Sequence, residues 1–204
     1  MLKGKTTRSK PFVVNTDYVQ IPRELMEHNK LVVLYIDILF VNNIPFLVTM
    51  SRNLKFATVE NLNSRSKSNI VAVLKNTVNI YERRRFKIQT ILVDPEFAML
   101  EREEEIGSKH IVNVALAGEH VPEIERFIMT LKERGRTQWS RLPYKECMPK
   151  IIVIALVRNC VTWLNSFPSV GSASSIYSPR TVMTGVKMDY NKHCQIPFEI
   201  CTGI

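Results

Sequence analysis

The segment LVVLYIDILFV at residues 31–41 constrains this chain most, because ten of its eleven residues are hydrophobic and the exception is Asp37. A continuous apolar run of this length predicts a strand that is covered on both faces. Asp is disfavoured in strands, and a buried carboxylate without a partner is costly. Something must therefore compensate Asp37: a cation, an Arg or Lys side chain, or backbone donors. A structural ion pair and a metal ligand both remain open.

Two further strands are expected directly after this run. Asn42-Asn43 can adopt the left-handed conformations of a tight hairpin turn, and the segment IPFLVTMS follows it. A third strand, KFATVE, comes after the turn at Arg52-Asn53. Three strands joined by such short turns predict an antiparallel meander.

The pattern then alternates between helical and extended segments. Residues 66–82 carry apolar side chains at helical spacing, and RRRFKIQTILVD at 83–94 predicts a fourth strand. A short helix over 95–105, a fifth strand over 110–116 and helices over 121–136 and 149–165 follow. The order β-β-β-α-β-α-β-α-α predicts an α/β fold of the RNase H-like type, with a five-stranded mixed sheet flanked by helices.

Three regions are expected along the chain. Residues 1–30 mix basic and polar residues without period and predict an extended basic arm or linker. Residues 31–166 contain all the expected strands and long helices and form the core, and residues 167–204 are a C-terminal extension.

The charge favours a polyanionic partner. The chain has 28 Lys and Arg residues against 19 Asp and Glu residues, a formal net charge of +9. Nucleic acid is the commonest partner of such a surplus, although a merely basic, soluble surface is the alternative. The four cysteines form no C-x-x-C pair, and the longest apolar run is too short to cross a bilayer. A zinc site and a membrane span are therefore not expected.

A second acid, Asp94, ends the expected fourth strand and precedes Pro95 and Glu96. An Asp before Pro is typical of a helix N-cap, with Pro in the first turn. Ligand sites in sheets of this kind also gather at the carboxyl ends of strands, where Asp94 is expected. The cap and the ligand are compatible interpretations.

A third acid is expected on the helix that begins near residue 121. Its core stripe at 100° per residue is Val121, Ile124, Phe127, Ile128 and Leu131. Glu125 lies on a flank of this stripe together with Met129, Lys132 and Arg136. That arrangement suits a carboxylate that binds metal beside cations that bind phosphate, and it equally suits an ordinary amphipathic helix. Glu119 and Glu123 compete for the same role.

Several segments together resemble the catalytic core of copia-type retrotransposon integrases, and they are most similar to the copia-like polyproteins of diatoms. IERFIMTLKER, at residues 124–134, is similar to the family's "A-E-R-K-N-R-T-L", in which the Glu is the third catalytic acid. The other similar segments, in order, are GKTTR at 4–8, FLVTMSR at 46–52, WLNSFPS at 163–169 and SPRTVMTG at 178–185.

The resemblance implies a D,D,E active site formed by Asp37, Asp94 and Glu125, which together bind two Mg²⁺ or Mn²⁺ ions. It implies DNA 3′-end processing and strand transfer, with DNA as partner, self-association on DNA, and a nuclear or retroelement-particle location. Lys132, Arg136 and the run Arg83, Arg84 and Arg85 are the expected phosphate contacts, although the run equally suits a solvated helix end.

The chain also departs from the family pattern. Only 30 residues separate Asp94 from Glu125, and the family's "D-N-G-G-E-F" is shortened to DPEF. The flexible loop before the catalytic helix, "P-Q-Q-N-G" in the family, reads AGEHVPE here. A second interpretation is therefore a degenerate, inactive integrase remnant that only binds nucleic acid. A third is an RNase H-fold nuclease of another kind, which would not account for the C-terminal segments.

Overall fold

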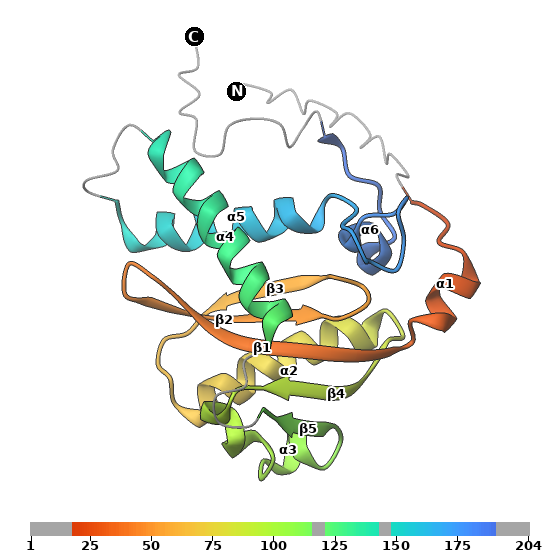
Figure 1. The fold of residues 1–204 in the computed structure, drawn as a ribbon, viewed down its shortest axis with the longest axis horizontal. Helices are drawn as coiled ribbons and strands as arrows, with labels where there is room; N and C mark the ends of the chain where they lie inside the picture. The colour runs from red at the N-terminus through yellow and green to blue at the C-terminus, as the bar shows by residue number, and fades with distance from the viewer. Residues whose placement is uncertain (1–17, 116–120, 143–147, 191–204) are drawn as a thin grey trace, which may run out of the picture.

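The computed structural model describes residues 18–115, 121–142 and 148–190. One five-stranded sheet in the order β3-β2-β1-β4-β5 is at the centre of the molecule, with helices on both faces (Figure 1). The strands are β1 (Leu31–Val41), β2 (Ile44–Ser51), β3 (Ala57–Asn61), β4 (Lys87–Val93) and β5 (Ile111–Val114). The predicted α/β, RNase H-like fold with a mixed five-stranded sheet is confirmed.

The first three strands form the expected antiparallel meander. β1 pairs with β2 from Leu34↔Ser51 to Val41↔Ile44, and β2 pairs with β3. Asn42 and Asn43 take φ angles of 48° and 59°, the left-handed conformations that a two-residue hairpin of this twist requires. The two asparagines therefore set the β1–β2 register.

β1 and β4 form the parallel pair at the middle of the sheet. Their register runs from Leu31↔Lys87 to Ile36↔Val93 and shifts by one residue between Val32 and Val33. β4 also pairs in parallel with β5. β1 is thus paired along its whole length, with β4 over residues 31–36 and with β2 over residues 34–41, and its apolar side chains are largely buried, as the run predicted.

Two hydrophobic cores cover the two faces of the sheet. On one face, α2 (Lys67–Arg83) packs against alternate residues of β1 such as Leu34 and Ile36. On the other face, α4 (Pro122–Ser140) and α5 (Lys150–Asn165) pack against Tyr35 and Leu39. Ile124, Ile128 and Leu131 of α4 are buried, and Val121 and Phe127 pack beside them, so the predicted stripe of α4 is confirmed.

Several short elements differ from the expectation. The predicted extended arm contains the helix α1 (Arg23–His28), and the C-terminal extension contains α6 (Pro179–Thr184). The single short helix expected over 95–105 is two segments, η1 (Pro95–Leu100) and α3 (Glu104–Gly107). The strand predicted over 83–94 begins only at Lys87, because α2 continues to Arg83. The GKTTR segment and Glu119 lie outside the described residues.

Candidate active site

Asp37 is on the face of the sheet that α4 and α5 cover. Side chains alternate between the two faces of a strand, and both Tyr35 and Leu39 belong to the core under those helices. Asp37 itself is half-buried, whereas Tyr35 is 2% exposed and Leu39 is 1% exposed. The carboxylate is therefore at the border of the core, where it keeps some contact with solvent.

Asp94 directly follows the end of the neighbouring parallel strand. Ile36 of β1 is paired with Val93 of β4, so the next residue of each strand is an aspartate. Neighbouring strands lie about 4.8 Å apart, and residues in register on them share a face. Asp94 has extended backbone angles of φ −71° and ψ 161°, and its carbonyl accepts a hydrogen bond from Phe97 N at 2.9 Å as η1 begins.

The prediction that Asp94 caps a helix is correct for its position in the chain but not for its side chain. Asp94 is the N-cap residue of η1, and Pro95 is in its first turn. However, its side chain accepts no capping hydrogen bond. The carboxylate is therefore not committed to the start of this helix.

The electrostatic surroundings of Asp37 are acidic. The pKa of Asp37 is raised from 3.8 to about 6, chiefly by burial and in addition by the carboxylates of Asp94, Glu96 and Glu125, whereas the backbone N–H of Ile38 lowers it. That N–H donates to Asp37 Oδ1 at 2.6 Å. Among the described residues, no Arg or Lys forms an ion pair with Asp37. Among the described residues, the protein group that compensates this carboxylate is therefore the backbone N–H of Ile38.

Glu125 and Glu123 differ in what they face. Glu125 is exposed in the first turn of α4 and acts on the pKa of Asp37. Glu123 is half-buried and interacts with the hydroxyl of Tyr35, whose pKa is raised first by burial and then by this carboxylate. Of these two acids, Glu125 is therefore the one that adds to the acidic surroundings of Asp37.

The sequence interpretation did not include Glu96 and Arg65 in the site. Glu96 Oε2 accepts a hydrogen bond from Arg65 at 2.8 Å, and the Arg65 guanidinium also lies 5.7 Å from the ring centroid of Phe40. The sequence offered one indication that Glu96 lies in this cluster: Asp94 and Glu96 are two acids on either side of Pro95. The ion pair partly neutralises the acidic cluster at its exposed side.

Hard oxygen donors of this kind suit Mg²⁺ or Mn²⁺. Yet within residues 18–115, 121–142 and 148–190, no three His, Cys, Asp or Glu side chains are close enough together to hold a metal ion. Mg²⁺ commonly keeps several waters and uses one or two carboxylates plus substrate phosphates. Asp37 and Asp94, in register on neighbouring strands, fit that smaller requirement, and Glu125 is a more distant third carboxylate.

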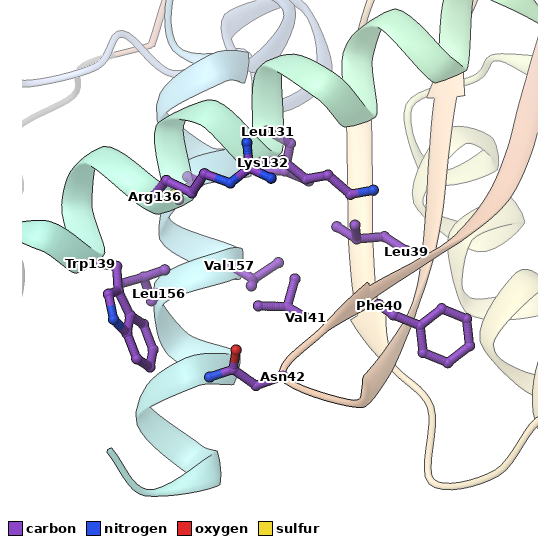
Figure 2. A pocket seen from close by; sticks show the side chains of 12 residues that line it. Leu39, Phe40, Val41, Asn42, Leu131, Lys132, Arg136, Trp139, Leu156 and Val157 are labelled. Carbon is purple, nitrogen blue, oxygen red and sulfur yellow. The ribbon is translucent and has the colours of Figure 1, made fainter. Parts of the chain in front are cut away.

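A cavity of about 460 Å³ lies between the β1–β2 hairpin, α4 and α5, and none of the three predicted acids is among its lining residues. Figure 2 shows Lys132 and Arg136 on the α4 side of this cavity, with Leu39 and Val41 of β1 opposite. Its other wall is formed by Leu156 and Val157 of α5. Trp139 and Asn42 complete the lining at the end of the cavity toward the hairpin turn. Two predicted phosphate contacts therefore border one apolar hollow.

The arginine run is at the other end of the sheet. Arg83 ends α2, Arg84 follows it as the C-cap, and both precede Lys87, which begins β4. Asp94 follows the last residue of that strand, so about 23 Å of extended chain separates Lys87 from Asp94. The five predicted phosphate contacts thus form two groups, of which only Lys132 and Arg136 are on the helix that carries Glu125.

No helix in the described part of the chain is long and apolar enough to span a bilayer.

No model of a known protein family matches the sequence, and no curated protein does. Among solved structures, the catalytic core domain of BIV integrase is similar, with a TM-score of 0.53 and 14% sequence identity. The match covers 74% of this chain and 92% of that chain. At this identity the likeness concerns the fold alone: the chain has the α/β fold of a retroviral integrase catalytic core.

Proposed function

We propose that this chain is a metal-dependent polynucleotidyl transferase of the copia-type integrase group, which processes DNA 3′ ends and joins them to target DNA. The observation that carries the proposal is Asp37, a half-buried acid with no cationic partner among the described residues, which Asp94, Glu96 and Glu125 surround electrostatically. The integrase-like fold and the order of the similar segments support it.

In this proposal Asp37 and Asp94 bind the divalent ions, Mg²⁺ or Mn²⁺, and Glu125 completes the ligand set. Such ions, when bound, supply a deprotonated water or 3′-hydroxyl and stabilise the leaving oxygen of an in-line displacement at phosphorus. The carboxylates also have an electrostatic role without substrate. Their mutual repulsion, which adds to the effect of burial in raising the pKa of Asp37, favours any cation that enters between them.

Lys132 and Arg136 hold the phosphates of the DNA end beside the acids. They follow Glu125 on α4 by two and three helical turns, so they are on the same side of the helix. The cavity that they border has an apolar floor, which excludes water from the groups beside it. A phosphate held at this rim is oriented toward the acidic end of β1. This makes positioning, rather than covalent chemistry, the main contribution of α4.

The expected partners and location follow from this activity. DNA ends and target DNA are the substrates, and we propose self-association on DNA, as the resemblance to the integrase family implies. Action in the nucleus or in a retroelement particle is part of the same proposal.

The alternative is a chain that binds nucleic acid without cleaving it. One observation favours it: the described carboxylates are not close enough together for a site with three protein ligands. In that case Lys132, Arg136 and the net charge of +9 would still bind DNA.

The deciding experiment is a strand-transfer and cleavage assay on a labelled duplex with a free 3′ end, in Mn²⁺ or in EDTA. We expect Mn²⁺-dependent products from the wild type and at least a hundredfold less from Asp37→Asn. Glu125→Gln should also lose activity, whereas Glu133→Gln, an exposed acid two turns further along α4, should retain it.

Thermal unfolding supplies an independent measurement of metal binding. A ligand that binds only the folded state raises the melting temperature, so Mn²⁺ should stabilise the wild type and leave Asp37→Asn unchanged. The alternative would be established if the wild-type protein binds the duplex, leaves the DNA intact and keeps the same melting temperature with and without Mn²⁺.

A further inference from the structure

A basic hollow of about 840 Å³ is present at the amino end of the β1–β4 pair, the end opposite Asp94. One wall is α1 together with Lys30, the residue before β1, and the other is the end of α2. Its charged lining is five basic residues and one acid: Arg23, Glu27, Lys30, Arg83, Arg84 and Arg85. The candidate active site uses none of these side chains.

The positive charge in the basic hollow is largely uncompensated. Glu27 accepts from Arg23 at 2.7 Å, an exposed pair one helical turn apart. Lys30, Arg83 and Arg85 are exposed, and none of them has an ion pair within the part of the chain that the structure describes. Because three cations share one hollow without partners, the hollow attracts anions.

Hydrogen bonds fix the walls of the basic hollow relative to each other. The Nε of Arg84 donates to the carbonyl of Val182 in α6 at 3.1 Å. The backbone N–H of Lys87 donates to the carbonyl of Lys30 at 2.8 Å, which joins the end of the α1 wall to the start of β4. The cations are therefore attached to a rigid frame, so little ordering is needed when a ligand binds.

Arg85 is held in a backbone conformation that favours glycine. Its φ is 68°, and it follows the C-cap of α2, where Phe86 N donates to Tyr81 O at 3.0 Å in the pattern of a Schellman motif. Glycine is the usual residue here because any side chain is strained at positive φ. The fold therefore gains nothing from arginine at this position, and a role for its charge accounts for it.

We propose that the basic hollow binds the phosphate backbone of duplex DNA, as a second contact surface in addition to the candidate active site. Four of its five cations are arginines, whose planar guanidinium groups match phosphate oxygens in pairs. α1 is six residues long, about 9 Å, and one DNA strand rises about 3.4 Å per phosphate, so the wall spans two to three phosphates. Several exposed cations that line one hollow suit a strand of phosphates better than one small anion.

The test is DNA binding by the full chain in EDTA, measured by fluorescence anisotropy with a labelled duplex of about 20 base pairs over a series of salt concentrations. Each lost phosphate contact makes the slope of log affinity against log salt shallower by about 0.9. Arg85→Gly should weaken binding several-fold with that change of slope, and its melting temperature should be no lower than that of the wild type, because strain is relieved. Arg83→Gln should weaken binding with an unstrained backbone.

Lys55→Gly is the matched control. Lys55 is also basic with a positive φ, 54°, but it is in the β2–β3 turn and does not line the basic hollow. The Lys55→Gly substitution should relieve similar backbone strain and change the affinity for DNA less than twofold. An equal loss from Lys55→Gly and Arg85→Gly, or no loss from Arg85→Gly, would overturn the proposal.

A second experiment distinguishes DNA from a membrane surface as the ligand of the basic hollow. Vesicles of phosphatidylcholine with phosphatidylserine replace the duplex, and we expect Arg85→Gly to leave any vesicle binding unchanged. A loss confined to the vesicles would assign the hollow to lipid and overturn the DNA proposal. Because metal is absent throughout, this test is independent of whether the candidate active site is catalytic.

Discussion

Asp37 is a residue at which the chain gives up stability, and under the proposed function it does so in order to bind a metal ion. A hydrophobic residue at this position would extend the core formed by Tyr35 and Leu39, and it would avoid three neighbouring carboxylates. Instead, the chain keeps an acid whose charged form burial disfavours. A free acid in this place therefore costs stability at neutral pH.

The pH dependence of this cost can be measured with Asp37→Asn. The folded-state pKa is raised from 3.8 to about 6, so the unfolded chain releases its proton first, and wild-type stability falls as the pH rises from 4 to beyond 6. Asn cannot ionise and can still accept from Ile38 N. We expect Asp37→Asn to be more stable than the wild type by about 1 to 2 kcal/mol at pH 8, allowing for solvent screening.

Urea unfolding in EDTA from pH 4 to pH 8 provides the measurement. The advantage of Asp37→Asn should vanish near pH 4, and Glu133→Gln should show no such trend. A constant difference over the whole range would mean that ionisation of Asp37 is not its cause.

The sequence identified Asp37 because a single acid interrupts an apolar run, which is a local signal. It did not identify the Arg65–Glu96 pair, because these exposed residues are 31 positions apart and neither interrupts a pattern. It also could not give the register between β1 and β4. That Asp37 and Asp94 end up next to each other is information from the structure.

At the scale of the elements, Asn165 joins the end of α5 to the edge strand β3. Its side-chain amide donates to Ala57 O at 2.7 Å and accepts from Ala57 N at 2.9 Å. Asn165 is 5% exposed, so these bonds are shielded from water. This asparagine belongs to the WLNSFPS segment that resembles integrases, and in this chain it satisfies backbone groups at a sheet edge.

Asn165→Ala should destabilise the protein by about 2 to 3 kcal/mol, because it leaves a buried N–H and a buried C=O without partners. Asn159→Ala is a matched control on the same helix. The Oδ1 of Asn159 is buried, and no partner for it is present among the described residues. Its removal should be neutral or slightly stabilising, as denaturant unfolding of the two variants can establish. Equal losses of stability in the two variants would mean that both substitutions weaken helix α5 itself, and that the hydrogen bonds of the Asn165 amide are not the cause.

The elements that the sequence predicted well have strong periodicity or a distinctive turn. α4 and the Asn42-Asn43 hairpin are examples. The end of α2 was predicted to within one residue, whereas the start of β4 was predicted four residues too early, because the turn after α2 carries Arg85 instead of glycine and so gave no stop signal. α1 is six residues long, too short for a periodic pattern.

At the scale of the whole molecule, one strand pair connects two regions of opposite charge. The acids are where the pairing of β1 with β4 ends, directly after Ile36 and Val93, and the basic hollow is at the amino end of that pairing. A duplex that contacts both regions would meet cations far from the acids, which repel phosphates unless metal is bound.

This separation predicts additive effects on DNA binding. Arg136→Ala and Arg85→Gly alter sites about 20 Å apart or more, since Arg136 shares a cavity with Leu39 of β1, whereas Arg85 lies near Lys87, which pairs with Leu31 at the other end of that strand. Their losses in binding free energy should therefore sum to within about 0.5 kcal/mol in the double variant. Anisotropy titrations of the four proteins at one salt concentration would measure this. A double variant no weaker than the weaker single variant would mean that the two regions compete for the same DNA.

The register shift between Val32 and Val33 has a consequence for length changes during evolution. Val32 is opposite Ile88 and Val33 is opposite Thr90, so Gln89 is an extra residue on the β4 side. Deletion of Gln89 would remove this irregularity and leave Asp37 and Asp94 in the same register on the two strands. A deletion between Thr90 and Val93 would instead move Asp94 to the face of the sheet under α2. Natural variants that gain or lose a residue should therefore do so upstream of position 90.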